Sequence, residues 1–268
     1  MGFSGLTIGQ YLPGGSILHR LDPRTKIIGV TGLVVMLFFV PSFAGLGGFA
    51  ALVLALFAVA RISPAYALRG IRPLIVLLVF TALLNTFFAP VADGHVLFRF
   101  GPLMATMEGL RTGLFVAARL ILLVVVTSLM TFTTSPVELT DGLERLLRPF
   151  QRLGVPGHEL AMMTTIALRF IPTLLEETDK IMKAQMARGA EFDRGGVLAR
   201  ARAFVPVLVP LMVSAFRRSE DLALAMEARC YRGGAGRTRM NELRWQAADV
   251  VAFLVMGAAA AAVVWVRR

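Results

Sequence analysis

Five apolar runs dominate the pattern of hydrophobic and polar positions along this chain. They cover residues 27–40, 44–60, 74–88, 114–132 and 247–266. A helix needs about 20 mainly apolar residues to cross the hydrocarbon core of a bilayer, so the shorter runs must use their flanking residues as well. The long connection 89–110 is expected to be a loop of mixed charge. This pattern predicts a polytopic membrane protein with about five transmembrane helices.

A different pattern fills the stretch between the fourth and fifth runs. Apolar residues recur there mostly every three or four positions, which is the period of an amphipathic helix, at Leu160, Met163, Ala167, Phe170, Leu174 and Ile181. The spacing predicts a helix of about 30 residues that ends at Arg188, where Gly189 suits a helix terminus. A second long helix is expected from near Arg200 to Arg229, and its part 203–216 is almost wholly apolar.

Composition supports the membrane assignment and suggests an orientation. Of the 268 residues, 56% are hydrophobic and 17% are charged, and the mean hydropathy of +0.71 is too high for an ordinary soluble domain. The net charge of +11 reflects Arg and Lys before residue 27, in 61–72 and after 133. Positive residues collect on the cytoplasmic side of membrane proteins, so these segments are predicted to be cytoplasmic and the protein to lie in the cell membrane. No basic run is interleaved with aromatic residues, and nucleic-acid binding is not expected.

We therefore predict an all-α fold in four parts. An N-terminal segment spans 1–26, and four transmembrane helices lie within 27–132. A cytoplasmic domain of long helices spans 133–245, and a last transmembrane helix lies within 246–268. The charged cluster His19–Lys26 is expected to anchor the first part at the membrane surface.

The sequence shows no catalytic or metal-binding constellation. One cysteine and three scattered histidines make a His/Cys metal site unexpected, and no Walker A pattern is present for binding ATP. Glu176, Glu177 and Asp179 are expected to form a solvated helix face. Arg119 interrupts the fourth run and is expected to face another helix or a polar layer, although an ionisable group at membrane depth can also mark function. No catalytic, cofactor or metal residue is therefore predicted.

One short pattern occurs twice. The copies are Ala187-Arg188-Gly189 and Ala228-Arg229-Cys230, separated by 41 residues (229 minus 188), and each is followed by Arg-Gly-Gly. Each copy ends a predicted long helix. A single Arg at such a position is explained by the helix dipole, which attracts cations to the C-terminus. Two copies at matched helix ends favour another interpretation, namely two docking tips for two copies, or two homologues, of one partner.

The sequence resembles the T components, the transmembrane coupling subunits, of energy-coupling-factor (ECF) vitamin transporters. The resemblance covers nearly the whole chain and is carried by three segments. The opening, residues 9–14 and 18–26, looks like that of the family, and 167–174 resembles its first long coupling helix. The two Ala-Arg motifs, with 231–234, are similar to the family signature. The second motif commonly ends in Gly or another small residue, and Cys230 stands there in this chain.

The resemblance implies a non-catalytic subunit of an ATP-driven transporter. Two cytoplasmic ATPases of the ABC type are expected to bind ATP and Mg, so that this chain binds no cofactor itself. One tip is expected to sit in a groove of each ATPase, through Ala187, Arg188, Gly189, Ala228, Arg229 and Cys230. A separate substrate-binding membrane subunit, the S subunit, is expected to contact apolar residues of the long helices, namely Met163, Ala167, Phe170, Leu174, Phe204, Leu208 and Leu211.

Three alternatives stay open. The nearest is a dedicated biotin- or cobalt-type T component, in place of one shared among several S subunits. A conventional ABC permease would itself line the substrate path, but it usually carries one coupling loop per half, and the duplicated motif argues against it. An intramembrane enzyme should show clustered His, Asp or Glu at membrane depth, which Arg119 alone does not satisfy.

Overall fold

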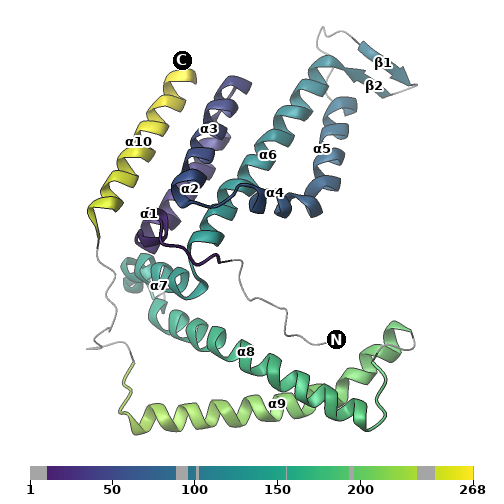
Figure 1. The fold of residues 1–268 in the computed structure, drawn as a ribbon, viewed down its shortest axis with the longest axis vertical. Coiled ribbons are helices and arrows are strands. Elements are labelled where there is room, and N and C mark those ends of the chain that lie inside the picture. Colours follow the sequence, from purple (N-terminus) through teal and green to yellow (C-terminus); the bar gives the residue numbers. More distant parts are fainter. Residues whose placement is uncertain are drawn as a thin grey trace. The chain divides into compact units, whose positions relative to one another are not determined.

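A computed structural model describes residues 11–88, 96–100, 103–154, 156–192, 196–233 and 245–267. The chain is helical apart from one short hairpin (Figure 1), and the predicted all-α class is confirmed. The α-helices are α1 (Ile17–Arg20), α2 (Pro23–Phe39), α3 (Phe43–Ala60), α4 (Ala65–Ile71), α5 (Ile75–Phe88), α6 (Met107–Thr133), α7 (Pro136–Leu147), α8 (Gly157–Ala187), α9 (Val197–Ala228) and α10 (Ala247–Arg267). Two 3-10 helices, η2 (Arg72–Leu74) and η3 (Arg148–Leu153), and two strands, β1 (Val96–Phe100) and β2 (Leu103–Thr106), complete the order.

The chain forms two compact units. We call Gly9–Gly142 with Leu243–Arg268 the membrane unit, and Leu143–Glu242 the long-helix unit. The division falls inside α7, whereas the sequence analysis placed its boundary at residue 133. The reason is that the first turns of α7 pack on α2, where a Cβ added to Gly142 would lie 2.9 Å from Cβ of Pro23.

Among the described residues of the membrane unit, three helical stretches are long and apolar enough to span a bilayer. They are Phe43–Ala60, Ala65–Phe87 and Met107–Thr133. They coincide with three of the five predicted runs, and the second of them combines α4, η2 and α5. The other two runs fall on α2, which has 17 residues, and on α10, whose stretch Ala247–Ala261 is a shorter apolar helix. These two spans stay predictions.

Side-chain caps fix where the membrane helices begin. Asp22 precedes α2 and accepts a hydrogen bond from the backbone N–H of Arg24 at 2.9 Å, with Pro23 at the first helical position. Ser42 caps α3 and Thr106 caps α6 in the same way. The sequence pattern placed the start of the fourth run at residue 114. The N-cap shows that the helix begins one to two turns earlier, at Met107.

Close backbone contacts hold the membrane unit together. Gly109 and Gly113 bring α6 against α5, because a Cβ at either position would lie 2.7 Å from a carbonyl oxygen of α5. A buried apolar core joins α2, α3, α4 and α6, and its most enclosed side chains are Leu37, Val53, Phe57 and Val126.

The connection 89–110 is only partly the loop that the sequence predicted. Strands β1 and β2 pair antiparallel within it, with a register shift between Val96 and Phe98. The mixed charge of this stretch concealed two short, mainly apolar segments. Residues 89–95 and 101–102 lie outside the described part of the chain.

Candidate functional site

The first tip, Ala187-Arg188-Gly189, ends α8 in a Schellman motif. The N–H of Gly189 donates to the carbonyl of Met186, and the N–H of Ala190 donates to that of Gln185, both at 3.0 Å. This pair of bonds satisfies carbonyls that a helix end would otherwise leave open. Arg188 is the C-cap residue, so its side chain leaves the last turn of the helix.

The second tip, Ala228-Arg229-Cys230, repeats this geometry at the end of α9. The N–H of Cys230 donates to the carbonyl of Glu227 at 2.8 Å, and the N–H of Tyr231 donates to that of Met226 at 3.0 Å. Arg229 is the C-cap residue. The two sequence copies are therefore two copies of one local structure.

The residue after each Arg adopts a left-handed backbone conformation. Gly189 has φ of +90° and Cys230 has φ of +56°. Glycine accepts this region freely, whereas a residue with a Cβ is destabilised there by about 1 kcal/mol. Cys230 therefore takes the backbone shape of the glycine in the first tip at some cost in stability.

Both tip arginines are exposed and open to a partner. Within the described part of the chain, neither the Arg188 nor the Arg229 guanidinium forms a hydrogen bond or an ion pair. Ala187 and Ala228 are exposed beside them and present only a methyl group. Each tip thus offers an unpaired planar donor group, suited to a carboxylate or carbonyl, next to a small side chain that permits close approach.

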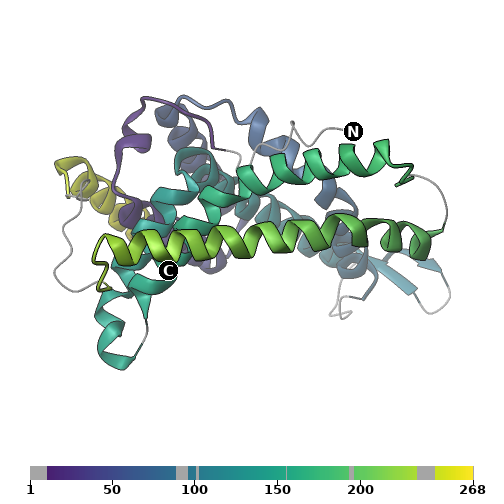
Figure 2. The same ribbon diagram turned by 90° about the horizontal axis from the view of Figure 1, so that it is seen from below.

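The two tips lie at opposite ends of an antiparallel helix pair (Figure 2). The guanidinium of Arg218 lies 6.0 Å from the ring centroid of Phe170, and Gln185, later in α8, contacts Pro206, earlier in α9. Since α8 has 31 residues that rise about 1.5 Å each, the tips are separated by about 45 Å. The structure keeps the two predicted tips apart and does not bring them into one site.

A polar contact joins the middle of the two helices. Glu177 of α8 accepts a hydrogen bond from the hydroxyl of Ser214 and pairs with Arg218 of α9, whose Nη2 lies 3.3 Å from Oε2 of Glu177. The expectation of a solvated acidic face is therefore wrong for Glu177. It holds for Glu176, which is exposed, whereas Asp179 is as enclosed as Glu177 and pairs with the exposed Lys183 one turn along α8.

A proline carbonyl tethers the first tip. Pro210 has no N–H, so the carbonyl of Pro206 lacks its usual partner within α9. The side-chain amide of Gln185 donates to that carbonyl at 3.4 Å from the last turns of α8. The carbonyl of Pro206, which has no partner within α9, thus holds the end of α8 through Gln185, three residues before Arg188.

A second tether holds the other tip. Nδ1–H of His158 donates to Oε1 of Glu144 at 3.0 Å, and Nε2 of the same ring lies 3.4 Å from the hydroxyl of Tyr231. Tyr231 is the residue directly after the second tip, His158 begins α8 and Glu144 lies on α7. The tether therefore links the second tip to both other helices of the long-helix unit.

The predicted S-subunit surface on α9 divides between two faces. Leu208 is half-exposed, and Phe204 is partly exposed beside Phe192, with ring centroids 5.2 Å apart. Leu211 belongs to another stripe, at helical spacing with the buried Val207 and with Ser214 of the contact to α8. The exposed apolar face of α9 also includes Val205, Val209, Met212, Val213 and Phe216.

The predicted surface on α8 divides in the same way. Met163 and Ala167 are exposed, together with Leu160 one turn earlier. Phe170 lies under Arg218 of α9, and Leu174, one turn later, is half-buried. The open part of this face is therefore the first half of the predicted set.

Lys26 forms a polar joint in the membrane unit that the sequence analysis missed. It is only 8% exposed, and its Nζ donates to the carbonyls of His19 and Thr133, both at 2.9 Å. The ammonium thereby caps the C-terminus of α6, where a cation is favourable. The expected role as a surface anchor is wrong for this residue. No local spacing signals this joint, because Thr133 lies 107 residues further along the chain.

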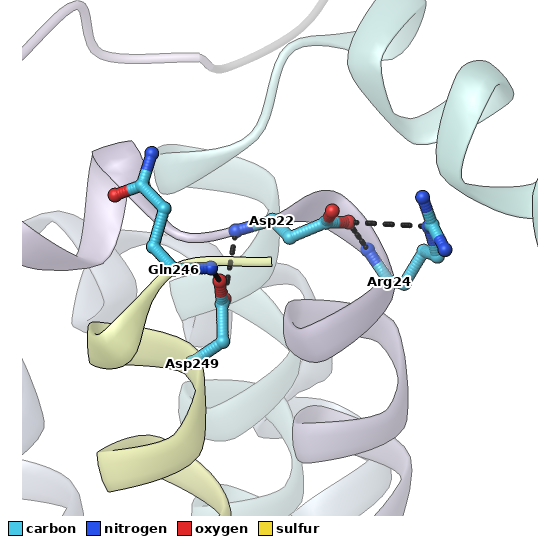
Figure 3. Close-up of polar contacts among 4 residues, drawn as sticks. All are labelled: Asp22, Arg24, Gln246 and Asp249. Carbon is cyan, nitrogen blue, oxygen red and sulfur yellow. Dashed lines mark hydrogen bonds and ion pairs between the residues drawn. The ribbon is translucent and has the colours of Figure 1, made fainter. Parts of the chain in front are cut away.

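Asp249, on α10, lies in the same region, beside Asp22 at the start of α2 (Figure 3). Its side chain is fully buried and accepts hydrogen bonds from the backbone N–H groups of Asp22, at 3.0 Å, and Gln246, at 2.8 Å. One carboxylate thus caps α10 and fixes the start of α2.

Arg119 meets the expectation that it faces another helix. Its Nη2 donates to the carbonyl of Val40 at 2.7 Å, at the C-terminal end of α2, and the guanidinium lies 4.8 Å from the ring centroid of Phe115. Among the described residues, no group of three His, Cys, Asp or Glu side chains is placed to hold a metal ion.

Comparisons with known proteins agree over almost the whole chain. Residues 14–240 match the family model described as CbiQ, cobalt transport protein. The energy-coupling factor transporter transmembrane protein EcfT of Thermosediminibacter oceani is 58% identical over 252 residues, which are 94% of each chain. The EcfT proteins of Acidaminococcus fermentans and Bacillus subtilis are 52% and 46% identical, each over 94% of this chain and 92% and 96% of their own lengths.

Proposed function

The chain belongs to the CbiQ and EcfT family of energy-coupling factor transporter transmembrane proteins, and from this premise we propose that it couples two cytoplasmic ATPases to a substrate-binding membrane subunit. ATP-driven closure of the ATPases moves the two tips. The long helices carry that motion to the S subunit, which takes up a vitamin or another micronutrient. This chain transmits the motion and performs no chemistry; ATP and Mg are bound by the ATPases.

The observation that carries this proposal is the matched pair of tips. Arg188 and Arg229 occupy the same position in two identical helix-end motifs and have no partner among the described residues. A helix cap alone explains the left-handed residue after each Arg, but it would not require the same alanine before both arginines. Two equal tips about 45 Å apart fit two copies, or two homologues, of one partner.

The exposed apolar residues of the long helices support a second partner. Met163 and Leu208 are more than half exposed, although α8 and α9 bury other apolar side chains against one another. Contiguous exposed apolar surface of this kind marks protein or membrane contacts. We assign this surface to the S subunit. We place the long-helix unit and the N-terminus in the cytoplasm, because positive residues collect on the cytoplasmic side of membrane proteins.

We favour a T component that is shared among several S subunits. The matching family model is described as a cobalt transport protein, whereas the names of the relatives include no substrate. A conventional permease remains the alternative. It finds less support, because a substrate path would not explain two matched tips in the long-helix unit.

Charge reversal of the tips tests the proposal. The full chain is expressed with the two ATPases and an S subunit, as wild type and as Arg188→Glu, Arg229→Glu and the double variant. If each tip holds one ATPase, each single variant retains about half of the ATPase on co-purification. The double variant retains none, and ATP-dependent vitamin uptake is lost in all three.

Arg217→Glu is the matched control, since it reverses an exposed charge on α9 away from both tips. It should keep both ATPases and normal uptake. Retention of both ATPases and full uptake by the double variant would show that the arginines are only helix caps, and the proposed mechanism would then be wrong.

A further inference from the structure

Helix α4 and its flanks form a basic surface that has no counter-charge. We use the name α4 basic surface for Arg61, Tyr66, Arg69 and Arg72. No Asp or Glu occurs in the sequence between Asp22 and Asp93. Within the described residues, none of the three arginines forms an ion pair, and all three are exposed. The positive charge of this surface is therefore left for a ligand.

The burial pattern of α4 shows which way this surface faces. Ala67 and Ile71 are buried in the core of the membrane unit, at 0% and 8% exposure. Arg69 lies two residues from each of them, which at about 100° per residue places it on the opposite side of the helix. The guanidinium of Arg69 lies 5.3 Å from the ring centroid of Tyr66, a cation–π contact one turn away.

The position of α4 in the membrane unit identifies its surroundings. It lies between the end of α3 at Ala60 and the start of α5 at Ile75, and it forms the first part of the apolar stretch Ala65–Phe87. In Figure 1, α4 runs across the direction of α3, α5 and α6. A short helix across the ends of membrane helices lies at the level of the lipid headgroups, where Tyr and Arg are favoured.

We propose that the α4 basic surface binds the headgroups of anionic phospholipids. An unpaired arginine offers a fork of N–H donors that matches a phosphate, and three of them fit a surface of negative charge. Leu68 supports a lipid over an acidic protein, because this large apolar side chain is 55% exposed on the same short helix. A side chain of that kind is favourable against acyl chains. This site goes beyond the proposed coupling function and does not depend on it.

Native mass spectrometry of the purified full-length chain tests this site. The protein is extracted from mixed vesicles of phosphatidylcholine and phosphatidylglycerol, and the retained lipids are counted. Wild type should retain phosphatidylglycerol preferentially. Arg69→Gln should lower its affinity about fivefold, and Arg61→Gln/Arg69→Gln/Arg72→Gln about 100-fold, as expected for ~1 kcal/mol per basic side chain. Arg69→Lys should keep only part of the binding, because the charge remains but the fork of N–H donors is lost.

Arg111→Gln is the matched control. Arg111 is also exposed and also lies over an aromatic ring, 5.9 Å from the centroid of Phe43, but it lies near the start of α6, at the other end of the α5–α6 pair. It should leave phosphatidylglycerol retention at α4 unchanged. The proposal is overturned if wild type retains both lipids equally, if the triple variant binds like wild type, or if free inorganic phosphate displaces the lipid completely.

Discussion

The phenol oxygen of Tyr231 lies 3.4 Å from Nε2 of His158, so the segment that follows the second tip is tied to the first turn of α8. His158 is held in turn by Glu144 on α7. Through this contact the position of Arg229 depends on two helices other than its own. The first tip has a different tether, from Gln185 to a carbonyl of α9.

Removing the phenol hydroxyl should loosen the second tip alone. Tyr231→Phe loses one hydrogen bond, worth about 0.5–1.5 kcal/mol, and leaves the ring in place. Amide hydrogen exchange across 228–233 should become about two- to tenfold faster. Exchange across 187–190, at the first tip, serves as the internal control and should not change. Equal acceleration at both tips would contradict the separate tethers.

Glycine at position 230 should stabilise the protein. Cys230 holds φ of +56°, so Cys230→Gly removes a strain of about 1 kcal/mol and should raise the thermal midpoint by about 2–4 °C. Cys230→Val should lower it, because a β-branched side chain tolerates this region worse. Cys230→Ala removes the thiol but keeps a Cβ at this position. Its thermal midpoint should therefore stay close to that of wild type. A fall in the midpoint for Cys230→Gly would show that the thiol contributes more than the backbone strain.

Truncation of Asp249 should destabilise the membrane unit. Asp249→Ala leaves the buried N–H groups of Asp22 and Gln246 without their acceptor, at a cost of about 2–4 kcal/mol in the free energy of unfolding. Thermal unfolding in detergent measures the loss. Asp221→Ala, on the exposed surface of α9, is the control and should stay within about 0.5 kcal/mol of wild type. Similar midpoints for the two variants would refute the capping role.

A methyl group at position 142 should disturb the packing of α7 on α2. In Gly142→Ala the new Cβ meets Cβ of Pro23 at 2.9 Å and Cδ1 of Ile27 at 3.2 Å, an overlap that costs about 1–3 kcal/mol. Gly48→Ala, where nothing lies within 4 Å, should be neutral or stabilising, because Ala favours a helix more than Gly. An unchanged midpoint for Gly142→Ala would mean that α7 moves away without cost.

Helix type and helix ends were readable from the sequence because local chemistry sets them. Periodic apolar residues and a terminal glycine located the end of α8 at the residue where the Schellman motif lies. Tertiary partners were not readable. Nothing local shows that Lys26 reaches the carbonyl of Thr133, or that Leu211 belongs to the stripe that packs against α8, because both facts depend on segments distant in the sequence.

The missed hairpin has a different cause. Strands β1 and β2 are short, and the charged residues in and around them, Asp93, Arg99 and Glu108, are typical of a solvated loop. Only the pairing of Arg99 with Met104 and of Phe100 with Leu103 makes them strands. A pattern of four or five residues carries too little periodicity to predict such pairing.

The two tethers connect the ends of the helix pair to different helices. Both ends carry the same backbone shape, yet the first is tied by Gln185 to α9 and the second by Tyr231 and His158 to Glu144 of α7. Two identical partners that pull on these ends would therefore load α9 through one tether and α7 through the other.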